Sequence, residues 1–210
     1  MILFPQSVLS TAYFPPVEYF FAIAQSGKTL VEQHETYQKQ SYRNRCVIYS
    51  AGGPEALSIP VVKDGTYSRP IRDIKVDYSE PWLQHHVRAM KAAYNSSPFY
   101  EYYEDDILRI LNRKREFLFD LNMDILNLSL ELIGLKADIT LTEAFTPEYP
   151  EGDFRNLIHP KRKGPSLLET YQKEKTYFQV FSMKSGFVAN LSILDLLSNE
   201  GPNAISFLKI

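Results

Sequence analysis

A polar segment between His34 and Val47 carries the residue types that could do chemistry in this chain. It reads HETYQKQSYRNRCV, so histidine, carboxylate, amide, phenol, lysine and guanidinium groups follow one another without the apolar face of a helix or strand. Such a segment is either a solvated loop or the polar wall of a site. We predict the wall of a site, because planar guanidinium, amide and phenol groups are dense here.

Arg43 and Arg45 flank Asn44 within this segment. If the chain is extended here, both arginine side chains point to one side, and Asn44 points to the other with Tyr42. Two guanidiniums about 6 to 7 Å apart along a strand could grip a phosphate or a carboxylate. The alternative is a pair of surface arginines in weak ion pairs. The predicted substrate-binding residues are Tyr37, Lys39, Tyr42, Arg43, Asn44, Arg45 and Trp82.

Histidines supply the candidate catalytic groups. His85 is predicted at the edge of the apolar stripe of a helix, and a histidine there suits a general base because its ordinary pKa is about 6.5. His86 falls inside that stripe and is interpreted as a core residue. His34 and Glu35 could form a histidine oriented by a carboxylate, or they make structural hydrogen bonds at a strand end. The predicted catalytic residues are His85, His34 and Glu35.

The sequence indicates neither a metal site nor a particular cofactor. His34, Glu35 and His85 offer nitrogen and oxygen ligands, but the spacing typical of metal sites is absent. There is no glycine-rich phosphate loop. A proline-rich turn at 13–16 lacks the His-x-Gly-His motif of nucleotidylyl transferases, so it is interpreted as a helix start. Cys46, the one cysteine, is predicted to point into the core.

The first elements place the polar segment. Residues 2–9 are predicted to form a strand, 17–24 an apolar helix that Gly27 ends, and 29–31 a second strand. This β-α-β order predicts a parallel pair of strands with a site at their carboxyl ends. Because the segment from His34 directly follows the second strand, its position and its composition agree.

The remaining elements follow from turn residues and periodicity. Residues 47–78 are predicted to be short strands and hairpins, including 57–62 and 74–78, with turns at Gly52-Gly53-Pro54 and Asp64-Gly65. Three helices follow: one capped by Ser79, one starting at Ser97-Pro98, and one over 118–135 that Gly134 ends. Further predictions are a strand at 139–145, a strand at 177–183 and a helix at 191–198.

These elements predict an α/β fold with a mixed, partly parallel sheet, flanking helices and a C-terminal strand-helix segment packed on the same core. We predict a main α/β domain over 1–145, an exposed excursion over 146–175 rich in proline, and a C-terminal segment over 176–210. That last segment is too short to fold alone.

Composition limits the class of protein. The chain has 210 residues, 44% of them hydrophobic and 23% charged, which are globular proportions. A net charge of −2 gives no field for nucleic acid, so any anion binding must be local. No signal peptide or apolar stretch long enough to span a membrane is evident, and we expect a cytoplasmic protein. The many aromatic residues are compatible with an oligomer.

Several short segments, in this order and spacing, resemble the WbqC-like protein family. The similarity runs from about residue 2 to 135, and its residues are Tyr13-Phe-Pro-Pro16, Tyr19-Phe20, the run from Tyr37 to Arg45, Leu57 to Val61, Ile74 to Tyr78, Trp82, His85 and Tyr94 to Phe99. The family is named for a protein encoded among O-antigen biosynthesis genes. The resemblance therefore implies a role in surface polysaccharide biosynthesis.

Two functions are compatible with this resemblance. The first is an enzyme that modifies a nucleotide-linked sugar, a small anionic substrate, by acyl or aminoacyl transfer. Arg43, Arg45 and Lys39 would then bind phosphate or carboxylate, and His85 would act as the base. The second is a non-catalytic ligand-binding or scaffold protein of the same pathway, which needs the same pocket but no base.

Overall fold

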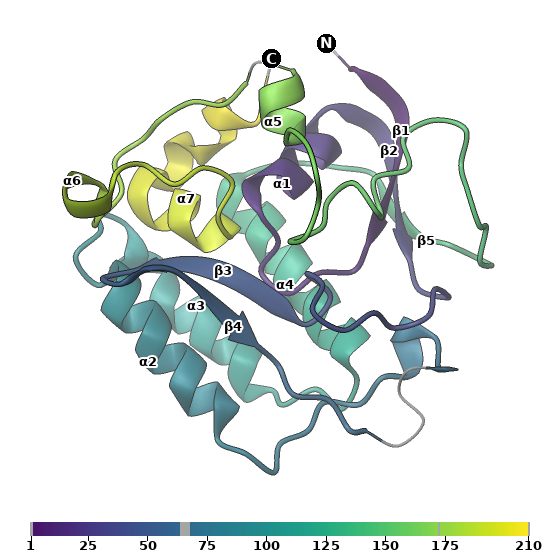
Figure 1. Cartoon of the computed structure of the whole chain (residues 1–210), viewed down its shortest axis with the longest axis horizontal. Coiled ribbons are helices and arrows are strands. Elements are labelled where there is room, and N and C mark those ends of the chain that lie inside the picture. Colours follow the sequence, from purple (N-terminus) through teal and green to yellow (C-terminus); the bar gives the residue numbers. More distant parts are fainter. Residues whose placement is uncertain (1, 64–67, 172, 210) are drawn as a thin grey trace.

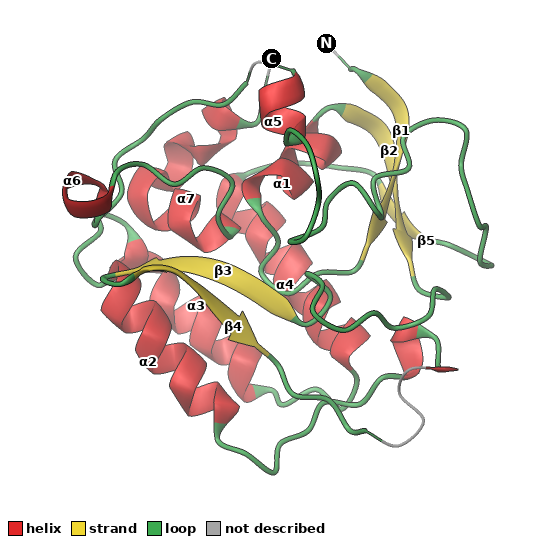
Figure 2. Cartoon of the chain, viewed as in Figure 1, coloured by secondary structure: helices red, strands yellow, loops and turns green. Residues whose placement is uncertain are grey.

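The computed structural model of the chain describes residues 2–63, 68–171 and 173–209 and has an α/β fold (Figures 1 and 2). A parallel sheet and an antiparallel hairpin are packed together with helices, which confirms the predicted class (Figure 2). The helices are α1 (Val17–Ala24), α2 (Trp82–Tyr94), α3 (Tyr100–Asn112), α4 (Leu118–Ile133), α5 (Leu167–Thr170), α6 (Ser182–Ser185) and α7 (Ile193–Glu200), with 3-10 helices at Ile71–Asp73 and Gly201–Phe207.

The chain opens as the predicted β-α-β unit. Strand β1 (Phe4–Ser10) pairs in parallel with β2 (Ser26–Glu32), and the almost wholly buried helix α1 joins them. Strand β5 (Ile139–Leu141) adds in parallel to β2 and is shorter than predicted. Gly27 does not end α1, because the helix stops at Ala24 with Gln25 as its C-cap, and Gly27 lies in β2. A Cβ at position 27 would lie 3.0 Å from the Pro5 carbonyl oxygen, so a glycine fits this strand closely against β1.

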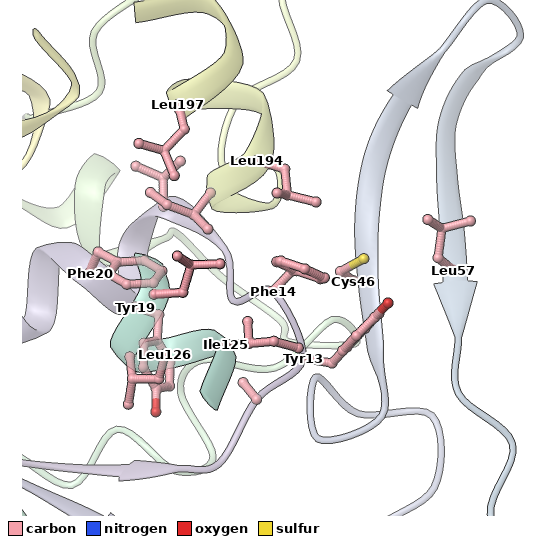
Figure 3. Packing of buried hydrophobic residues seen from close by; sticks show 14 of the residues in the cluster. Tyr13, Phe14, Tyr19, Phe20, Cys46, Leu57, Ile125, Leu126, Leu194 and Leu197 are labelled. Atoms are coloured by element: carbon pink, nitrogen blue, oxygen red, sulfur yellow. The ribbon is translucent and has the colours of Figure 1, made fainter. Parts of the chain in front are cut away.

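A hairpin of β3 (Arg45–Ser50) and β4 (Gly53–Ser58) forms the antiparallel sheet. Its inner face carries Cys46, Ile48 and Leu57, which are at most 2% exposed. Figure 3 shows Cys46 beside the rings of Tyr13 and Phe14, so this thiol packs in the core as predicted. The core therefore continues from the β-α-β unit to the hairpin.

Some predicted boundaries differ in the structure. Ser79 does not cap α2, because Asp77 binds the Ser79 backbone N–H at 2.9 Å and the helix begins only after Pro81. The segment 74–78 makes isolated bridges and no strand. Gly134, with φ of 71°, ends α4 as predicted. The predicted Asp64-Gly65 turn falls outside the described residues.

The strand predicted at 177–183 is wrong. Residues 177–179 are irregular and are followed by a turn and α6. Gln179 is fully buried, and its side chain donates to the Val188 carbonyl at 2.8 Å and accepts from the Val188 N–H at 2.9 Å. These local bonds replace pairing with a neighbouring strand. Helix α7 is confirmed, and it packs into the common core.

The segment 146–175 is not exposed along its whole length. The Val8 N–H donates to the Gly152 carbonyl at 2.7 Å, and the Phe154 N–H donates to the Val8 carbonyl at 2.9 Å. Phe154 and Arg155 are each 5% exposed. This part of the segment therefore lies along the free edge of β1, and the edge of the parallel sheet is covered. The division into 1–145, 146–175 and 176–210 stays a prediction.

Candidate functional site

Five of the predicted substrate-binding residues line one pocket of about 490 Å³, which we call the Arg45 pocket. They come from the loop before β3, the start of β3 and the start of α2. The pocket lies where the loop passes the beginning of the helix. These five residues are Tyr37, Lys39, Asn44, Arg45 and Trp82.

Three buried polar atoms of this pocket have no hydrogen-bond partner among the described residues: Asn44 Oδ1, Arg45 Nε and Trp82 Nε1. Trp82 is only 7% exposed, and Asn44 is fixed because its Nδ2 donates to the Ile59 carbonyl at 2.9 Å. An unsatisfied buried donor or acceptor costs about 1–3 kcal/mol. A ligand that offers oxygen atoms to the two donors and a hydroxyl to the amide oxygen would recover this cost.

The pocket carries charges of both signs. Lys39 and Lys63 join Arg45 on its walls, and Asp77 and Glu80 face the same space. Hydrogen bonds from Ser79, together with the charge of Lys63, lower the pKa of Asp77, so this carboxylate is ionised at neutral pH. The lining therefore suits a ligand that has an anionic group and also hydroxyl groups.

The Arg45 pocket continues into a groove between α2 and β4. A hollow of about 290 Å³ shares Trp82 with the pocket and is also lined by His85 and His86. A third hollow, of about 650 Å³, shares His85 with the second and is lined by Glu55 and Arg88. Figure 1 shows α2 running beside the hairpin that forms the other wall. His85, which is exposed, therefore stands between two parts of one groove.

His86 is buried, as predicted. Its Nδ1 lies 2.9 Å from the Tyr13 hydroxyl, and the ring also bonds the backbone of Ser58. Burial, together with the charge of His85, lowers the pKa of His86 to about 4. His86 is neutral at pH 7 and holds α2 to the hairpin, so it is unsuited to accept a proton from a substrate.

Arg43 and Arg45 do not share a face. Residues 42 and 43 form a turn, so the side-chain alternation of an extended strand does not apply there. Arg43 is 2% exposed; its Nε donates to Glu35 Oε1 at 2.8 Å and its Nη2 to Ser10 Oγ at 2.8 Å. The predicted two-arginine grip is wrong, and only Arg45 faces the pocket.

The carboxyl ends of the parallel strands hold a network of ion pairs. Ser10 ends β1, and Glu32, which ends β2, accepts from Thr142 Oγ1 at 2.9 Å and from Arg155 Nη1 at 3.3 Å. The rule that sites lie at the carboxyl ends of parallel strands could have indicated Ser10 and Glu32. The sequence did not indicate that Arg155 joins this network, because the residue lies in a segment predicted to be exposed.

The remaining predicted residues lie outside the Arg45 pocket. His34 Nε2 is 3.0 Å from the Thr142 carbonyl, and Glu35 binds Arg43. Tyr42 is half-buried, and burial raises its pKa to about 12, with a further contribution from the charge of Glu18. Of the three predicted catalytic residues, the structure brings only His85 to the groove.

Residues 11–158 match the model of the WbqC-like protein family, a range that includes the Arg45 pocket, His85 and the Arg43–Glu35 pair. The chain belongs to the WbqC-like protein family. A relative from Mycobacterium tuberculosis (strain ATCC 25618 / H37Rv), the "Uncharacterized protein Rv1507c", is 24% identical, and the similarity covers 97% of this WbqC-like chain and 96% of the relative. No solved structure gives a significant match.

The described residues offer neither a metal-binding cluster nor a membrane-spanning helix. Within residues 2–63, 68–171 and 173–209 of this WbqC-like protein, no group of three or more His, Cys, Asp or Glu side chains could hold a metal ion. Within the same residues, no helix has the length and apolar character needed to cross a membrane. The Arg45 pocket and its groove are therefore the candidate site.

Proposed function

We propose that this protein is an enzyme of surface polysaccharide precursor biosynthesis that binds a small anionic substrate, such as a nucleotide-linked sugar, in the Arg45 pocket. Its membership of the WbqC-like family supports the pathway. The reaction we propose is the transfer of an acyl or aminoacyl group to the sugar. The observation that carries the proposal is the set of unpartnered atoms, Asn44 Oδ1, Arg45 Nε and Trp82 Nε1, in one pocket.

Each pocket residue has a role in this proposal. Arg45 and Lys39 bind phosphate oxygens, because a guanidinium and an ammonium give charge-assisted hydrogen bonds. The Trp82 indole N–H donates to an oxygen of the substrate, and Asn44 accepts from a hydroxyl. Arg43 does not touch the substrate. It fixes the loop, since Asn122 Nδ2 also donates to its carbonyl at 2.8 Å.

His85 is the base of the proposed transfer. It takes the proton from an amine or hydroxyl of the sugar as that group attacks the carbonyl carbon of an activated donor, such as an acyl thioester. The new bond forms at the carbonyl carbon, the bond to the thiolate breaks, and the thiolate leaves as a thiol after protonation. His85 lines the hollow of about 290 Å³ that shares Trp82 with the Arg45 pocket, and this position supports the role.

A thermal-shift series with nucleotide sugars tests the binding step. A nucleotide sugar at about 100 times its Kd adds about 2.7 kcal/mol of stability, and Arg45→Ala and Trp82→Phe should each remove most of the shift. Trp82→Phe keeps an aromatic side chain but removes the pyrrole part of the indole together with its N–H. Arg109→Ala, on the exposed face of α3, is the matched control and should keep the shift. If a ligand stabilises wild type and Arg45→Ala equally, the Arg45 pocket is not its site.

A non-catalytic binding protein is the second candidate. It is favoured by the position of His85, which is exposed and lines the two neighbouring hollows but not the Arg45 pocket itself. His85→Gln separates the two candidates, because it should abolish acyl transfer and leave the thermal shift by the nucleotide sugar unchanged. If wild type binds the sugar but transfers no group from any acyl or aminoacyl donor, the binding-protein function is correct.

A further inference from the structure

Two side chains of opposite charge line the third hollow of the groove, beyond His85. Glu55 comes from β4, and Arg88 comes from the exposed side of α2. Among the described residues neither side chain has a hydrogen bond or an ion pair, with each other or with a third group. Long charged side chains at a surface usually find partners or extend into solvent. Here both border one hollow of about 650 Å³.

The register of the hairpin turns Glu55 inward. Glu55 is paired with Ile48, and the next inward pair is Cys46 with Leu57. Cross-strand partners point to the same side of a sheet, and the other three side chains of these two pairs are buried. Glu55 therefore occupies the inner face, where an apolar residue is expected, and it is half-buried. Glu55 borders the same hollow as the residues of α2.

The opposite wall is a single face of α2. Its lining residues recur at helical spacing, so they stand one above another along the hollow. The residues on this face are Pro81, Gln84, His85, Arg88, Ala89 and Ala92. The two alanines leave room beside the charged and polar side chains, and Ala51 and Gly52 do the same at the tip of the hairpin.

We infer that this hollow is a second binding site, for a zwitterionic ligand of the amino-acid class. Glu55 binds the ammonium group of the ligand, and Arg88 binds its carboxylate. Gln84 lines the same hollow and can bind the side chain or the carboxylate of the ligand. A ligand with both charges satisfies both walls at once. A simple anion would leave Glu55 unpaired, and a simple cation would leave Arg88 unpaired. This site does not depend on the proposed function of the Arg45 pocket.

Ligand-observed NMR with the common L-amino acids, taken one at a time, tests this site on the full chain. At least one should bind wild type, and Glu55→Gln and Arg88→Gln should each weaken it at least about tenfold, as expected for loss of one charge-assisted hydrogen bond. The matched controls Glu101→Gln and Arg109→Gln, on exposed positions of α3, should bind as wild type does.

Derivatives of the amino acid that lack one of its two charges identify which group of the ligand Glu55 binds and which group Arg88 binds. The N-acetyl form of the bound amino acid should bind wild type weakly and lose nothing further in Glu55→Gln. The methyl ester, which lacks the carboxylate, should also bind wild type weakly and should bind Arg88→Gln no more weakly than wild type. Arg45→Ala should leave amino-acid binding intact, so failure of the Arg45 pocket and failure of this site give different results.

The inference is overturned if no amino acid binds wild type, or if binding survives both Glu55→Gln and Arg88→Gln. An inward charge on an edge strand can also keep that edge from pairing with another chain. In that case Glu55→Leu should increase concentration-dependent self-association, measured by sedimentation, without any effect of amino acids.

Discussion

At the scale of single residues, the turn at 42–43 gives two neighbouring arginines different surroundings. Arg43 is 2% exposed and binds Glu35 and Ser10, whereas Arg45 leaves its Nε unpartnered in the pocket. A buried ion pair adds little net stability, but removing one partner leaves a charge stranded in the interior. Arg43 is therefore expected to act through the position of the loop.

Arg43→Met should destabilise the fold by about 3–5 kcal/mol, because Glu35 is then a buried, unpaired charge. Glu35→Leu combined with Arg43→Met should recover most of that loss, since neither charge remains. Urea unfolding of the single and double variants measures both effects. Arg109→Met is the exposed control and should cost little. A loss below about 1 kcal/mol for Arg43→Met would contradict the buried pairing.

His86 makes a second residue-scale prediction, concerning pH. Its pKa is lowered from 6.5 to about 4, so the unfolded chain binds a proton more readily than the folded chain. The stability that this histidine contributes is present above pH 6.5 and is lost as the pH falls through its folded pKa of about 4, a total of about 3 kcal/mol. The free energy of unfolding of wild type minus that of His86→Gln should therefore shrink between these pH values. The control is His85→Gln, a variant of the exposed neighbouring histidine, for which the same difference in unfolding free energy is measured. If the difference for His86→Gln does not change with pH, the pKa of His86 is not lowered.

At the scale of elements, the segment along β1 depends on contacts with residues distant in sequence. Gly152 has φ of 71°, and a Cβ there would lie 2.0 Å from the Gln6 carbonyl oxygen. Gly152→Ala should therefore break the pairing of this segment with β1 and cost more than the strain of the backbone alone. Gly164→Ala is the matched control, because Gly164 also has positive φ but has nothing within 4 Å of the Cβ position.

Urea unfolding and amide exchange at Val8 and Phe154 measure the Gly152 effect. The φ strain should cost each variant about 1–2 kcal/mol, and only Gly152→Ala should also speed exchange at the two amides. Equal losses and unchanged exchange in the two variants would mean that the segment is not held against β1.

Asp195, on the first turn of α7, shows the opposite dependence on pH. Burial raises its pKa from 3.8 to about 6, although Tyr177 and Gln179 donate to its carboxylate at 2.7 Å each. Its stabilising contribution is present below pH 3.8 and is lost as the pH rises through about 6, up to about 3 kcal/mol. Asp195→Asn keeps an acceptor oxygen without the charge, so its stability relative to wild type should rise from pH 4 to pH 7. A chemical denaturation series at these pH values measures this, and a relative stability that falls would contradict the burial of the carboxylate.

The elements differ in how far the sequence could predict them. Local patterns were sufficient for the β-α-β unit, for the end of α4 at Gly134, and for Cys46 in the core. They failed at the turn before β3, where Arg43 donates to Glu35 and Ser10, and at 177–183, where Gln179 bonds the backbone of Val188. In both places hydrogen bonds of one side chain decide the conformation. For the site, residue type indicated Arg45, Asn44 and Trp82. No pattern could indicate the groove along α2, because its other wall comes from β4.

At the scale of the whole molecule, the two buried titratable groups offset each other. Acid weakens the contribution of His86 over the same range in which it restores that of Asp195. The free energy of unfolding of wild type should therefore change less between about pH 4 and pH 6 than that of His86→Gln or that of Asp195→Asn. The two groups lie in different parts of the core, His86 on α2 and Asp195 on α7.

Residues 176–210 complete the core of the whole molecule. The Ser192 N–H donates to the Val47 carbonyl and the Ile193 N–H to the Pro15 carbonyl, both at 2.8 Å, so α7 joins the hairpin to the β-α-β unit. Figure 3 shows Leu194 and Leu197 of α7 facing the cluster that contains Phe14 and Phe20.

A chain ending at residue 175 should therefore fail to fold cooperatively, because it loses the buried leucines of α7 and leaves two carbonyls without their donors. Circular dichroism and thermal melting measure this. Leu196→Ala is the graded control: Leu196 is 0% exposed, and its truncation should cost about 2–5 kcal/mol while the transition stays cooperative. A sharp melting transition in the chain ending at 175 would mean that the main body folds without α7. The contacts that α7 makes with β3 and with α1 would then add stability to a fold already formed.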